Sequence, residues 1–368
     1  MKKVLFGITS LGLGGAERVL VDLCNELSKE YDITIFTIYS NGEMEKQLST
    51  NVKIKSLINK KYIDLTKWKK IWKPIEIMLF KNYIYKKYIK ADYDVEIAFL
   101  EGPITRLFSI PNENTKKIAW VHNDITKVFG KGIKASLKKE IDKNLYEKYS
   151  NLVFVSRDNQ EKFEGTYNLD AQKQVIYNYI DINSVIEKAQ AKPDIEFDAK
   201  ETNIVTVSRL VTQKAIDRLI KVHKRLIDEG LKHNIYVIGD GPERANLESL
   251  IRENNVQNTF KLMGAKENPY PYIKEADAFA LLSYFEGYPM VLLEAQILKK
   301  YIIITNTAAR ETLQNYSNSL ILENDEEAIF IGLCKYLKMK EDIENKNTNI
   351  EDYNNLNIIK QVKELIEE

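Results

Sequence analysis

The fold is constrained most strongly by a repeated alternation of short apolar runs with longer stretches of helical periodicity. In the first half of the chain the apolar runs cover residues 4–9, 33–38, 95–99, 118–121 and 152–155. Apolar runs of this length that alternate with helical stretches are typical of a parallel sheet with helices on its faces. We therefore predict an α/β fold whose first half is a Rossmann-like lobe.

The alternation starts again after a charged stretch at residues 181–202, which suits a linker because it contains Pro193. The later predicted strands lie at residues 204–207, 235–238, near 260, 278–282 and 302–305, with helices at 219–226 and 245–254 between them. A chain of 368 residues is longer than one hydrophobic core usually supports. We therefore predict an N-terminal lobe at residues 1–185 and a C-terminal lobe at 186–349, followed by a closing helical segment at 350–368.

Two such lobes would bind their ligand in a cleft, because open parallel sheets bind ligands at the carboxyl ends of their strands. The composition excludes several kinds of partner for that cleft. Lys and Arg number 54 against 53 Asp and Glu, so the net charge gives no reason to expect nucleic acid. Cys24 and Cys334 lie far apart, which fits a reducing compartment and excludes a cysteine-based zinc site or a disulfide framework.

The first 16 residues have a charged start, an apolar run and small residues, as a secretory signal has. They also form a predicted strand, a glycine loop and the start of a helix, and we prefer this interpretation because cleavage would remove that unit. No apolar run approaches the roughly 20 residues that cross a bilayer. We expect a cytoplasmic protein, either soluble or bound peripherally to the inner face of the cell membrane.

The strongest local motif is a pair of glutamates separated by seven residues, Glu286 and Glu294, after the predicted strand at 278–282. Pro289 suits the first turn of a helix, and Gly287 lets a ligand approach the backbone. The N–H groups and dipole at a helix N-terminus favour phosphate. Glu286 would then reach a sugar hydroxyl and Glu294 a ribose diol. The alternative is an ordinary helix with two solvated glutamates.

A second motif places Arg209 and Lys214 directly after the predicted strand at 204–207. Two cations on a strand-to-helix loop can neutralise a diphosphate leaving group, the arginine as a fork and the lysine as a point charge. The alternative is a solvated loop in a lysine-rich protein. The glycines of the motif at residues 239–243 are expected only to form a turn.

The glycine loop at residues 12–15 follows the first predicted strand. It resembles the dinucleotide fingerprint G-x-G-x-x-G, but Glu17 stands where the third glycine belongs, so we expect no NAD site. The loop can still admit a diphosphate or an acceptor.

His122 is the one histidine of the first predicted lobe and follows the strand at 118–121. A lone histidine is more often structural, but ligands bind at the carboxyl ends of such strands, so His122 is a candidate. His223 and His233 lie in or just after a helical pattern and are assigned no role.

The one Asp-x-Asp triplet, at residues 92–94, suggests a metal site at first sight. It precedes a predicted strand and so lies at the end of the sheet opposite the cleft. We therefore expect no metal. Arg209, Lys214 and a helix terminus can supply the electrostatic stabilisation that a metal otherwise provides.

Taken together, these motifs resemble family 4 of the retaining glycosyltransferases, which have the two-lobed GT-B fold. In order along the chain, the matching positions are residues 14–17, residues 175–181, Arg209, Lys214, residues 239–242 and residues 286–294. Their common order is more specific than any single motif. The resemblance implies a nucleotide-diphosphate sugar as donor substrate, no cofactor, and a closing helix that crosses back to the first lobe.

The resemblance also implies roles for single residues. Donor binding falls to Gly15, Arg209, Lys214, Glu286, Gly287, Tyr288, Met290, Val291 and Glu294, and catalysis to His122 and Glu286. In this scheme Arg209 and Lys214 bind the diphosphate, Glu294 the ribose, and Glu286 the transferred sugar. The family chemistry does not require Glu286 to be a covalent nucleophile, because front-face attack with the leaving phosphate as proton acceptor is equally compatible.

Two positions depart from the family pattern. Residues 299–301 read Lys-Lys-Tyr where a Gly-x-Pro turn is common, and Ala215 follows Lys214 where a glycine is usual. Neither departure removes a chemical group, so both concern loop geometry and donor preference.

Residues 60–90 hold ten lysines and only Asp64 and Glu76 as acids, with Trp68, Trp72, Phe80 and four tyrosines between them. A basic, aromatic, helix-forming stretch is typical of a surface that lies on anionic lipid, which indicates a lipid-linked acceptor. The alternative is a solvated helical pair whose aromatic residues belong to the core.

Three functions remain open. The first is transfer of a hexose or N-acetylhexosamine, from UDP first and GDP second, to a lipid-linked glycan in surface polysaccharide synthesis; the bacterial and polysaccharide parts are implied by the resemblance alone. The second is transfer to a soluble acceptor such as a protein, a metabolite or a glycan primer. The third is a non-catalytic subunit of the same fold, which the joint presence of the donor-binding residues disfavours.

Overall fold

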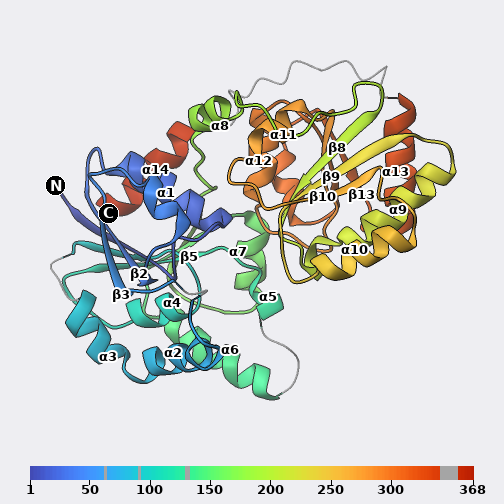
Figure 1. Ribbon diagram of the computed structural model, residues 1–368. Helices are drawn as coiled ribbons and strands as arrows, with labels where there is room; N and C mark the ends of the chain where they lie inside the picture. Colours follow the sequence, from blue (N-terminus) through green and yellow to red (C-terminus); the bar gives the residue numbers. More distant parts are fainter. Residues whose placement is uncertain (62–63, 90–92, 129–132, 340–354) are drawn as a thin grey trace. The chain divides into compact units, whose positions relative to one another are not determined.

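The computed structural model describes residues 1–61, 64–89, 93–128, 133–339 and 355–368. The chain divides into two compact units, the first formed by Met1–Ile180 with Asn354–Glu368 and the second by Asp181–Tyr353. The boundary predicted from the sequence lies near residue 185. Of the predicted closing segment, 350–368, residues 350–354 lie outside the described part. Each unit contains its own parallel sheet, which confirms the predicted α/β fold with two Rossmann-like lobes (Figure 1).

The first unit is built on a seven-stranded parallel sheet with the order β3-β2-β1-β4-β5-β6-β7. Its strands are β1 (Lys3–Ile8), β2 (Asp32–Tyr39), β3 (Lys53–Ile58), β4 (Val95–Ala98), β5 (Lys116–Val121), β6 (Asn151–Phe154) and β7 (Gln172–Val175). Its helices are α1 (Gly15–Leu27), α2 (Lys67–Leu79), α3 (Lys81–Ile84), α4 (Pro103–Phe108), α5 (Ile125–Val128), α6 (Ile133–Tyr146), α7 (Arg157–Glu164) and α14 (Asn355–Glu367), with short η1 (Glu43–Gln47) and η2 (Tyr85–Ile89).

The second unit has a six-stranded parallel sheet with the order β10-β9-β8-β11-β12-β13. Its strands are β8 (Thr202–Val207), β9 (His233–Ile238), β10 (Phe260–Gly264), β11 (Ala278–Leu281), β12 (Tyr301–Thr305) and β13 (Ser319–Leu322). Its helices are α8 (Ile182–Lys188), α9 (Ile216–Asp228), α10 (Arg244–Glu253), α11 (Tyr270–Glu275), α12 (Met290–Ile297) and α13 (Glu326–Met339), with short η3 (Thr212–Lys214) and η4 (Ala308–Leu313).

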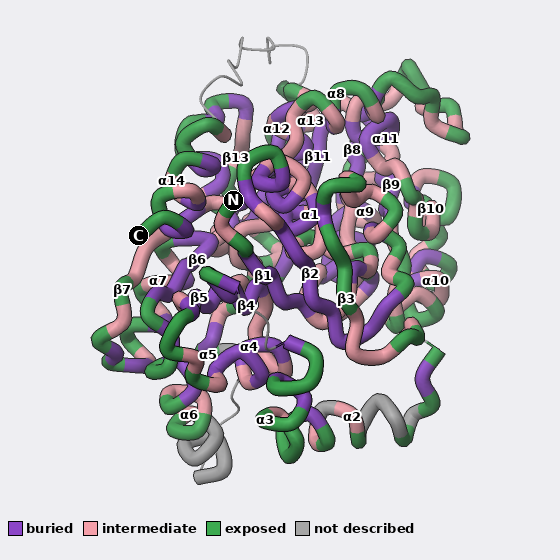
Figure 2. Tube along the Cα trace, turned by 90° about the vertical axis from the view of Figure 1, so that its left-hand side faces the viewer, coloured by how far each residue is buried: buried purple, intermediate pink, exposed green. Residues whose placement is uncertain are grey.

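The central strands are buried because helices cover both faces of a parallel sheet. Every residue of β4, β6 and β11 is buried, and Figure 2 shows the inner strands of the first sheet, such as β1 and β2, mostly in purple. These strands coincide with mainly apolar runs from which the sheets were predicted.

The edge strands β3 and β7 of the first sheet, like the edge strand β13 of the second, were not predicted from the sequence. An edge strand has a neighbour on one side only, so it is more open to water and needs fewer apolar residues. The first three residues of β3 are exposed, and β7, with the sequence QKQV, contains a single apolar residue. Neither β3 nor β7 has the mainly apolar run that marks the inner strands of this sheet.

The stretch predicted as a linker, residues 181–202, contains a helix of the second unit, α8. Asp181 begins this helix by accepting a hydrogen bond from the Ser184 backbone N–H at 2.9 Å. The helix packs against α11 and α12. The linker prediction was therefore wrong for residues 182–188, because one apolar-faced turn in a charged stretch gives too short a pattern to recognise.

The closing helix α14 belongs to the first unit. Two lysines of that unit donate to the carbonyl oxygens at its C-terminal end, Lys2 to Ile366 at 3.1 Å and Lys116 to Leu365 at 2.8 Å. The last carbonyls of a helix have no partner within it and carry the negative end of its dipole, so cations satisfy them well. These contacts attach the end of the chain to its beginning.

A buried polar triad joins η2 to the first sheet. Glu96 and Lys117 are direct partners on neighbouring strands, and their charged groups lie 2.5 Å apart. The Tyr85 hydroxyl donates to Glu96 at 2.6 Å and accepts from Lys117 at 2.9 Å. Burial raises the pKa of Glu96 and lowers that of Lys117, and their mutual attraction opposes both shifts. Leaving either charge unpaired there would be costly, so the triad fixes Tyr85 on the sheet.

His223 and His233, to which the sequence analysis assigned no role, form a buried hydrogen-bonded chain in the second unit. His233 Nδ1 lies 2.8 Å from the Leu231 carbonyl oxygen and therefore carries the proton. His233 Nε2 then accepts from His223 Nδ1 at 2.8 Å, and His223 Nε2 accepts from the Thr259 hydroxyl at 2.8 Å. This arrangement requires both rings to be neutral. Burial, together with the neighbouring ring, lowers the pKa of His223 to about 3, and burial lowers that of His233 to about 4.

Acid is therefore expected to destabilise the second unit through this pair. Both pKa values lie below the roughly 6.5 of an unfolded histidine, so the stabilisation is complete above that pH and is lost as the pH falls toward about 4. Each additional proton bound by the unfolded chain costs about 1.4 kcal/mol per pH unit. We expect the free energy of unfolding in urea to fall more steeply between about pH 7 and about pH 4.5 for the natural protein than for the His223→Gln, His233→Gln double variant. An equal pH dependence in the two proteins would contradict the neutral, buried state of the histidine pair.

Candidate functional site

In the second unit the strand order reverses between β8 and β11, which lie next to each other in the sheet. Ligands of open parallel sheets bind where the order reverses, at the carboxyl ends of the strands. The loops that follow these two strands hold most of the predicted donor residues, which are Arg209, Lys214, Glu286, Gly287 and Tyr288. The fold thus brings two motifs that are far apart in sequence to one edge of one sheet.

An ion pair joins the two loops. Lys214 Nζ lies 2.6 Å from Glu286 Oε1, and the two side chains are only 14% and 7% exposed. A short, charge-assisted contact that is largely shielded from water holds both groups in place more firmly than a surface pair would. An anionic ligand that approaches Lys214 must therefore share it with Glu286.

The backbone around Glu286 is fixed by further hydrogen bonds. The carbonyl oxygen of Gln213 accepts from the Tyr284 N–H at 2.9 Å, and the Gln213 side chain donates to the Phe285 carbonyl oxygen at 2.8 Å. The Thr305 hydroxyl donates to the Ser283 carbonyl oxygen at 2.7 Å. Because successive residues are held from different elements, the loop is a rigid support for Glu286.

Arg218, which the sequence analysis did not single out, lies buried beneath the same loop. Its guanidinium donates to the Leu282 carbonyl oxygen at 2.6 Å and to the Asn324 side-chain oxygen at 2.9 Å, and it stacks 4.5 Å from the centre of the Tyr284 ring. Asn324 in turn donates to the Tyr284 carbonyl oxygen at 2.8 Å. Burial lowers the pKa of Arg218. Its position next to the helix predicted at 219–226 gave no indication of this role, because its partners come from other parts of the chain.

Helix α12 begins at Met290, with Pro289 as the residue before its first turn. The sequence analysis placed Pro289 inside that turn, so the helix starts one residue later than predicted. Pro289 offers no side chain to cap the N-terminal N–H groups. Backbone donors at the start of a helix bind anions well, and the amides of Met290 and Val291 lie at this end.

Glu294 is the fifth residue of α12 and is buried, with 7% of its surface exposed. The hydroxyl of Tyr270 donates to its Oε1 at 3.1 Å. Tyr270 is the first residue of α11, a helix that packs against α12. The carboxylate therefore has a defined orientation without any ligand.

Arg209, a predicted donor residue, and Gly239, for which only a turn is predicted, have different surroundings. Arg209 is exposed, and no hydrogen bond or ion pair of its side chain is found among the described residues. Gly239 has a φ of 143°, and a side chain on it would meet the Ser208 carbonyl oxygen at 1.8 Å. A glycine is therefore required at position 239 by the close approach of two loops, which agrees with a turn-forming role.

In the first unit the strand order reverses between β1 and β4. The glycine loop follows β1, Gly14 precedes α1 and Gly15 is its first residue. Gly15 is exposed at this helix terminus. The loop after β4 contains Glu101, which the sequence analysis missed.

Glu101 fixes the loop that carries His122. Its Oε1 accepts from the backbone N–H groups of His122 and Asn123 at 2.6 and 2.7 Å, and its Oε2 accepts from the Asn123 side chain at 2.8 Å. Burial raises the pKa of Glu101, while these three donors oppose the rise. A carboxylate directly after a central strand was the available signal, but its partners lie 21 residues or more away.

His122 is half-buried and packs against Phe99, with ring centres 4.8 Å apart. Burial lowers its pKa to about 4, although a hydrogen bond to the Phe99 backbone opposes the change. His122 Nε2 is buried and has no hydrogen-bond partner among the described residues. A neutral imidazole that donates through Nδ1 presents Nε2 as an acceptor, so this ring can accept a hydrogen bond from a hydroxyl.

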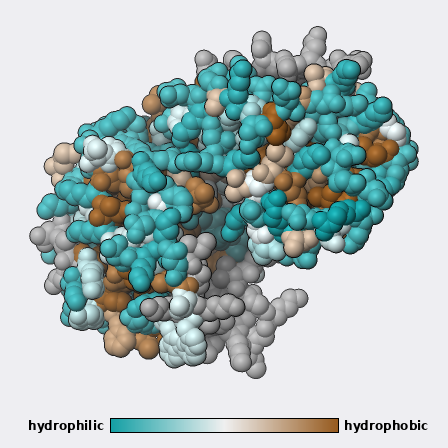
Figure 3. All heavy atoms as spheres, viewed as in Figure 1, coloured by the Kyte–Doolittle hydropathy of each residue, from teal (hydrophilic) through white to brown (hydrophobic). Residues whose placement is uncertain are grey.

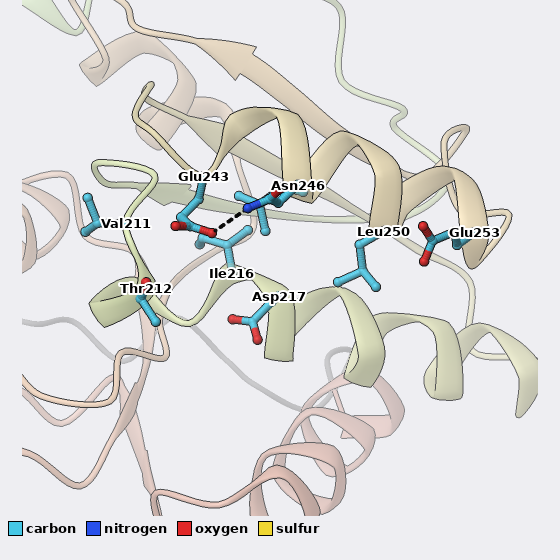
Figure 4. A pocket seen from close by; sticks show the side chains of 9 residues that line it. Val211, Thr212, Ile216, Asp217, Glu243, Asn246, Leu250 and Glu253 are labelled. Atoms are coloured by element: carbon cyan, nitrogen blue, oxygen red, sulfur yellow. Dashed lines mark hydrogen bonds between the residues drawn. The ribbon is translucent and has the colours of Figure 1, made fainter.

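A pocket of about 280 Å³ opens between α9 and α10 of the second unit (Figure 4). Side chains from the two helices and from the loop after β8 line it, namely Val211, Thr212, Ile216, Asp217, Glu243, Asn246, Leu247, Leu250 and Glu253. None of the predicted donor residues is among them. Its three carboxylates and lack of a cation make it unsuited to a diphosphate.

Within the described residues, no three His, Cys, Asp or Glu side chains are grouped so that they could hold a metal ion. Of the Asp-x-Asp triplet, Asp92 lies outside the described part. Asp94 accepts a hydrogen bond from the Lys3 backbone N–H at 2.7 Å, at the start of β1.

The basic segment, residues 60–90, contains α2, α3 and η2, and its residues 62, 63 and 90 lie outside the described part. Trp68 and Trp72 stack on each other, with ring centres 5.8 Å apart, yet remain 70% and 52% exposed. Leu79, Phe80 and Tyr83 are also mainly exposed. Trp68, Trp72, Phe80 and Tyr83 therefore do not belong to the core, whereas Tyr85 of the same segment does. Among the helices that the structure describes, none combines the length and apolar character needed to cross a membrane.

Two family models match the chain and together cover most of it. Residues 13–184 match the model described as Glycosyltransferase Family 4, and residues 187–354 match Glycosyl transferases group 1. A Campylobacter jejuni N-acetylgalactosamine-N,N'-diacetylbacillosaminyl-diphospho-undecaprenol 4-alpha-N-acetylgalactosaminyltransferase is 28% identical over 358 residues, covering 92% of this chain and 91% of the relative. The crystal structure of Anabaena HepE in complex with UDP and glucose has a TM-score of 0.76 and 17% identity, with complete coverage of both chains. That likeness shows the two-lobed GT-B fold.

Replacing Ala215 by glycine is expected to stabilise the second unit. Ala215 precedes α9 with a φ of 51°, a left-handed conformation that costs a residue with a Cβ on the order of 1 kcal/mol and glycine much less. The Ala215→Gly variant should therefore unfold at a temperature up to a few degrees higher. Ala245→Gly is the matched control, because Ala245 is exposed in right-handed helix α10, where glycine costs about 1 kcal/mol. Destabilisation by both variants would contradict the interpretation.

Proposed function

This chain belongs to the glycosyltransferases that join a Glycosyltransferase Family 4 domain to a Glycosyl transferases group 1 domain, and we propose that it transfers a hexose or N-acetylhexosamine from a nucleotide-diphosphate sugar to a lipid-linked glycan, with retention of configuration. The observation that carries the proposal is the Lys214–Glu286 pair at the point where the second sheet reverses its strand order. It combines a cation for a phosphate with a carboxylate for a sugar.

The donor diphosphate is assigned to Lys214, Arg209 and the N-terminus of α12. The ammonium of Lys214 is already shielded from water, and the exposed Arg209 is available for a bidentate contact. The α12 amides from Met290 and Val291 add a helix terminus that no side chain caps. Glu294 is placed on the same helix for the ribose, since a carboxylate accepts hydrogen bonds from both hydroxyls of a diol.

The chemical step needs stabilisation of the diphosphate as it leaves. Lys214, Arg209 and the helix terminus supply positive potential at that position, so the proposed reaction uses no metal. Glu286 would hold the transferred sugar by its hydroxyls. The acceptor hydroxyl would attack from the face that the diphosphate leaves, and the leaving phosphate oxygen would take its proton, which retains the configuration at the reacting carbon.

His122 fits the role of a neutral sugar contact in this reaction. Its low pKa keeps the ring uncharged near neutral pH, and Nε2 is the acceptor. A neutral ring can accept a hydrogen bond from a sugar hydroxyl without competing with Lys214 and Arg209 for the diphosphate. Gly15, exposed at the start of α1, is assigned to the donor from the first unit.

The proposed donor carries UDP, with GDP as the second choice. HepE, which has the same fold, was crystallised with UDP and glucose. The name of the Campylobacter relative gives N-acetylgalactosamine as the sugar transferred and a diphospho-undecaprenol compound as the acceptor. A second relative from the same organism, 26% identical over 350 residues, is named as an alpha-1,4-N-acetyl-D-galactosaminyltransferase acting on a PP-undecaprenol glycan. These names support a lipid-linked acceptor for this chain.

The basic segment is the proposed contact with the membrane that would present such an acceptor. Its tryptophans are exposed, and hydrophobic residues gather on the surface of the first unit in the region where Figure 1 places α2 and α3 (Figure 3). Lysines attract anionic headgroups, whereas tryptophan and other aromatic residues insert at the headgroup level. On this basis the protein would act as a peripheral protein at the inner face of the membrane.

A panel of UDP- and GDP-sugars tests the donor site. A ligand that binds only the folded state raises its stability by RT ln(1 + [L]/Kd), or about 2.7 kcal/mol at 100 times Kd. At least one donor should raise the melting temperature by several degrees. Lys214→Ala and Glu294→Ala should lose this shift, because each removes an assigned contact.

Glu286→Gln separates the two members of the ion pair. It leaves Lys214 without its anionic partner, so nucleoside diphosphate binding should be retained or tightened while transfer falls on the order of 100-fold or more. If none of the UDP- and GDP-sugars raised the melting temperature, the proposed function would be refuted. Normal shifts in both alanine variants would show that the donor site lies elsewhere.

Membrane contact can be measured by co-sedimentation with liposomes. Replacing Trp68 and Trp72 by serine, or Lys67, Lys69, Lys70 and Lys73 by glutamine, should weaken binding to vesicles rich in phosphatidylglycerol. Each lysine near an anionic surface contributes roughly 1 kcal/mol, so the fourfold lysine variant should bind at least about 100-fold more weakly. Replacing Lys224, Lys232, Lys261 and Lys335 of the second unit by glutamine controls for net charge. Unchanged sedimentation of both test variants would refute the membrane contact.

A further inference from the structure

The phenol of Tyr270 lies where it can control the orientation of Glu294. Tyr270 is 1% exposed and is one of the largest fully buried side chains among the described residues. It begins α11, and its backbone N–H lies 3.3 Å from the Asn268 side-chain oxygen. The Asn268 side chain also donates to the Lys188 carbonyl oxygen at the end of α8, at 2.8 Å. The ring is therefore enclosed, and the backbone that carries it is fixed to a second helix.

Glu294 needs such a partner more than a surface glutamate does. Its side chain has three rotatable bonds and is 7% exposed, so the carboxylate is largely removed from water. A buried carboxylate without hydrogen bonds is costly, and a hydroxyl donor reduces that cost. The hydrogen bond from Tyr270 to Oε1, at 3.1 Å, also selects one orientation of the carboxylate plane.

We propose that Tyr270 is a positioning residue, whose hydroxyl orients the Glu294 carboxylate so that it recognises the 2′,3′-diol of a ribonucleoside diphosphate. The inference rests on the proposed function and extends it from Glu294 to the residue that holds it. A carboxylate accepts about four hydrogen bonds, so one phenol hydroxyl uses a small part of this capacity. Without the hydroxyl the carboxylate would lose one of the contacts that orient it, and part of the binding free energy would be spent on ordering it.

The chain offers a matched control two residues further along the same helix. Tyr272 is also buried, at 4% exposure, and its hydroxyl also donates to a carboxylate, that of Asp194. Asp194 lies outside α12 and pairs with Lys266 at 2.5 Å. Tyr272→Phe therefore removes the same group from the same helix without touching Glu294.

The experiment measures affinity of the full chain for UDP and for 2′,3′-dideoxy-UDP by calorimetry, with GDP and its dideoxy counterpart used if the natural protein prefers guanine. The natural protein should bind the ribose form more tightly. In Tyr270→Phe the preference should shrink by about 3- to 10-fold, which is the range of one ordinary hydrogen bond, while the affinity for the dideoxy form changes little. Tyr272→Phe should keep the full preference.

Glu294→Gln provides a second measurement. Adding Tyr270→Phe to Glu294→Gln should have no further effect on the preference for ribose, because the group being positioned is already changed. An unchanged preference in a folded Tyr270→Phe variant, or an equal loss in Tyr272→Phe, would overturn the inference. If the natural protein bound neither UDP nor GDP, the proposed function itself would fail. If it bound UDP and dideoxy-UDP equally, the donor site would stand and the role of Tyr270 would be refuted.

Discussion

The reversal of strand order between β8 and β11 is the constraint on which the second unit's candidate site depends. Lys214 and Glu286 are 72 residues apart, and neither motif alone is more than a charged loop. Because β8 and β11 are neighbours, the loops after them begin side by side, and the ammonium and carboxylate meet at 2.6 Å. The pair then fixes both loops, so the topology and the ion pair support each other.

The candidate residues are held in place from neighbouring elements rather than from their own loops. Arg218 of α9 supports the backbone before Glu286, Tyr270 of α11 contacts Glu294, and Glu101 holds the backbone of His122. Each contact involves a charged group with restricted access to water. There, removing one partner costs more stability than the net gain from the hydrogen bond, because the other partner is left unpaired. Such contacts limit the motion of the candidate residues, which suits recognition of a ligand by shape.

The sequence was sufficient for the fold because buried parallel strands are rich in apolar residues, and each central strand has a short, mainly apolar run. The edge strand β7, with one apolar residue, and helix α8, with a single turn of pattern, lacked that signal. The motifs around Glu286 and Lys214 were found because each combines charge with a turn or helix start. Whether all assigned residues bind donor remains a prediction. Arg218 and Tyr270 were missed for a different reason: their roles are defined by partners 24 to 106 residues away, and no local pattern encodes such contacts.

The basic segment, residues 60–90, has one set of side chains buried against the first unit and another set exposed to water. Tyr85 points to the sheet and completes the Glu96–Lys117 triad, and Ile77 of α2 is also buried. Tyr85 and Ile77 already pack the segment against the core of the first unit. The exposure of Trp68 and Trp72 is therefore not explained by a segment that fails to pack. Two stacked indoles in water leave apolar surface uncovered, which a folded protein retains at a cost unless a partner covers it. A headgroup layer that is apolar below and polar above matches the indole ring better than water does, and the triad would hold the segment in place for the proposed contact.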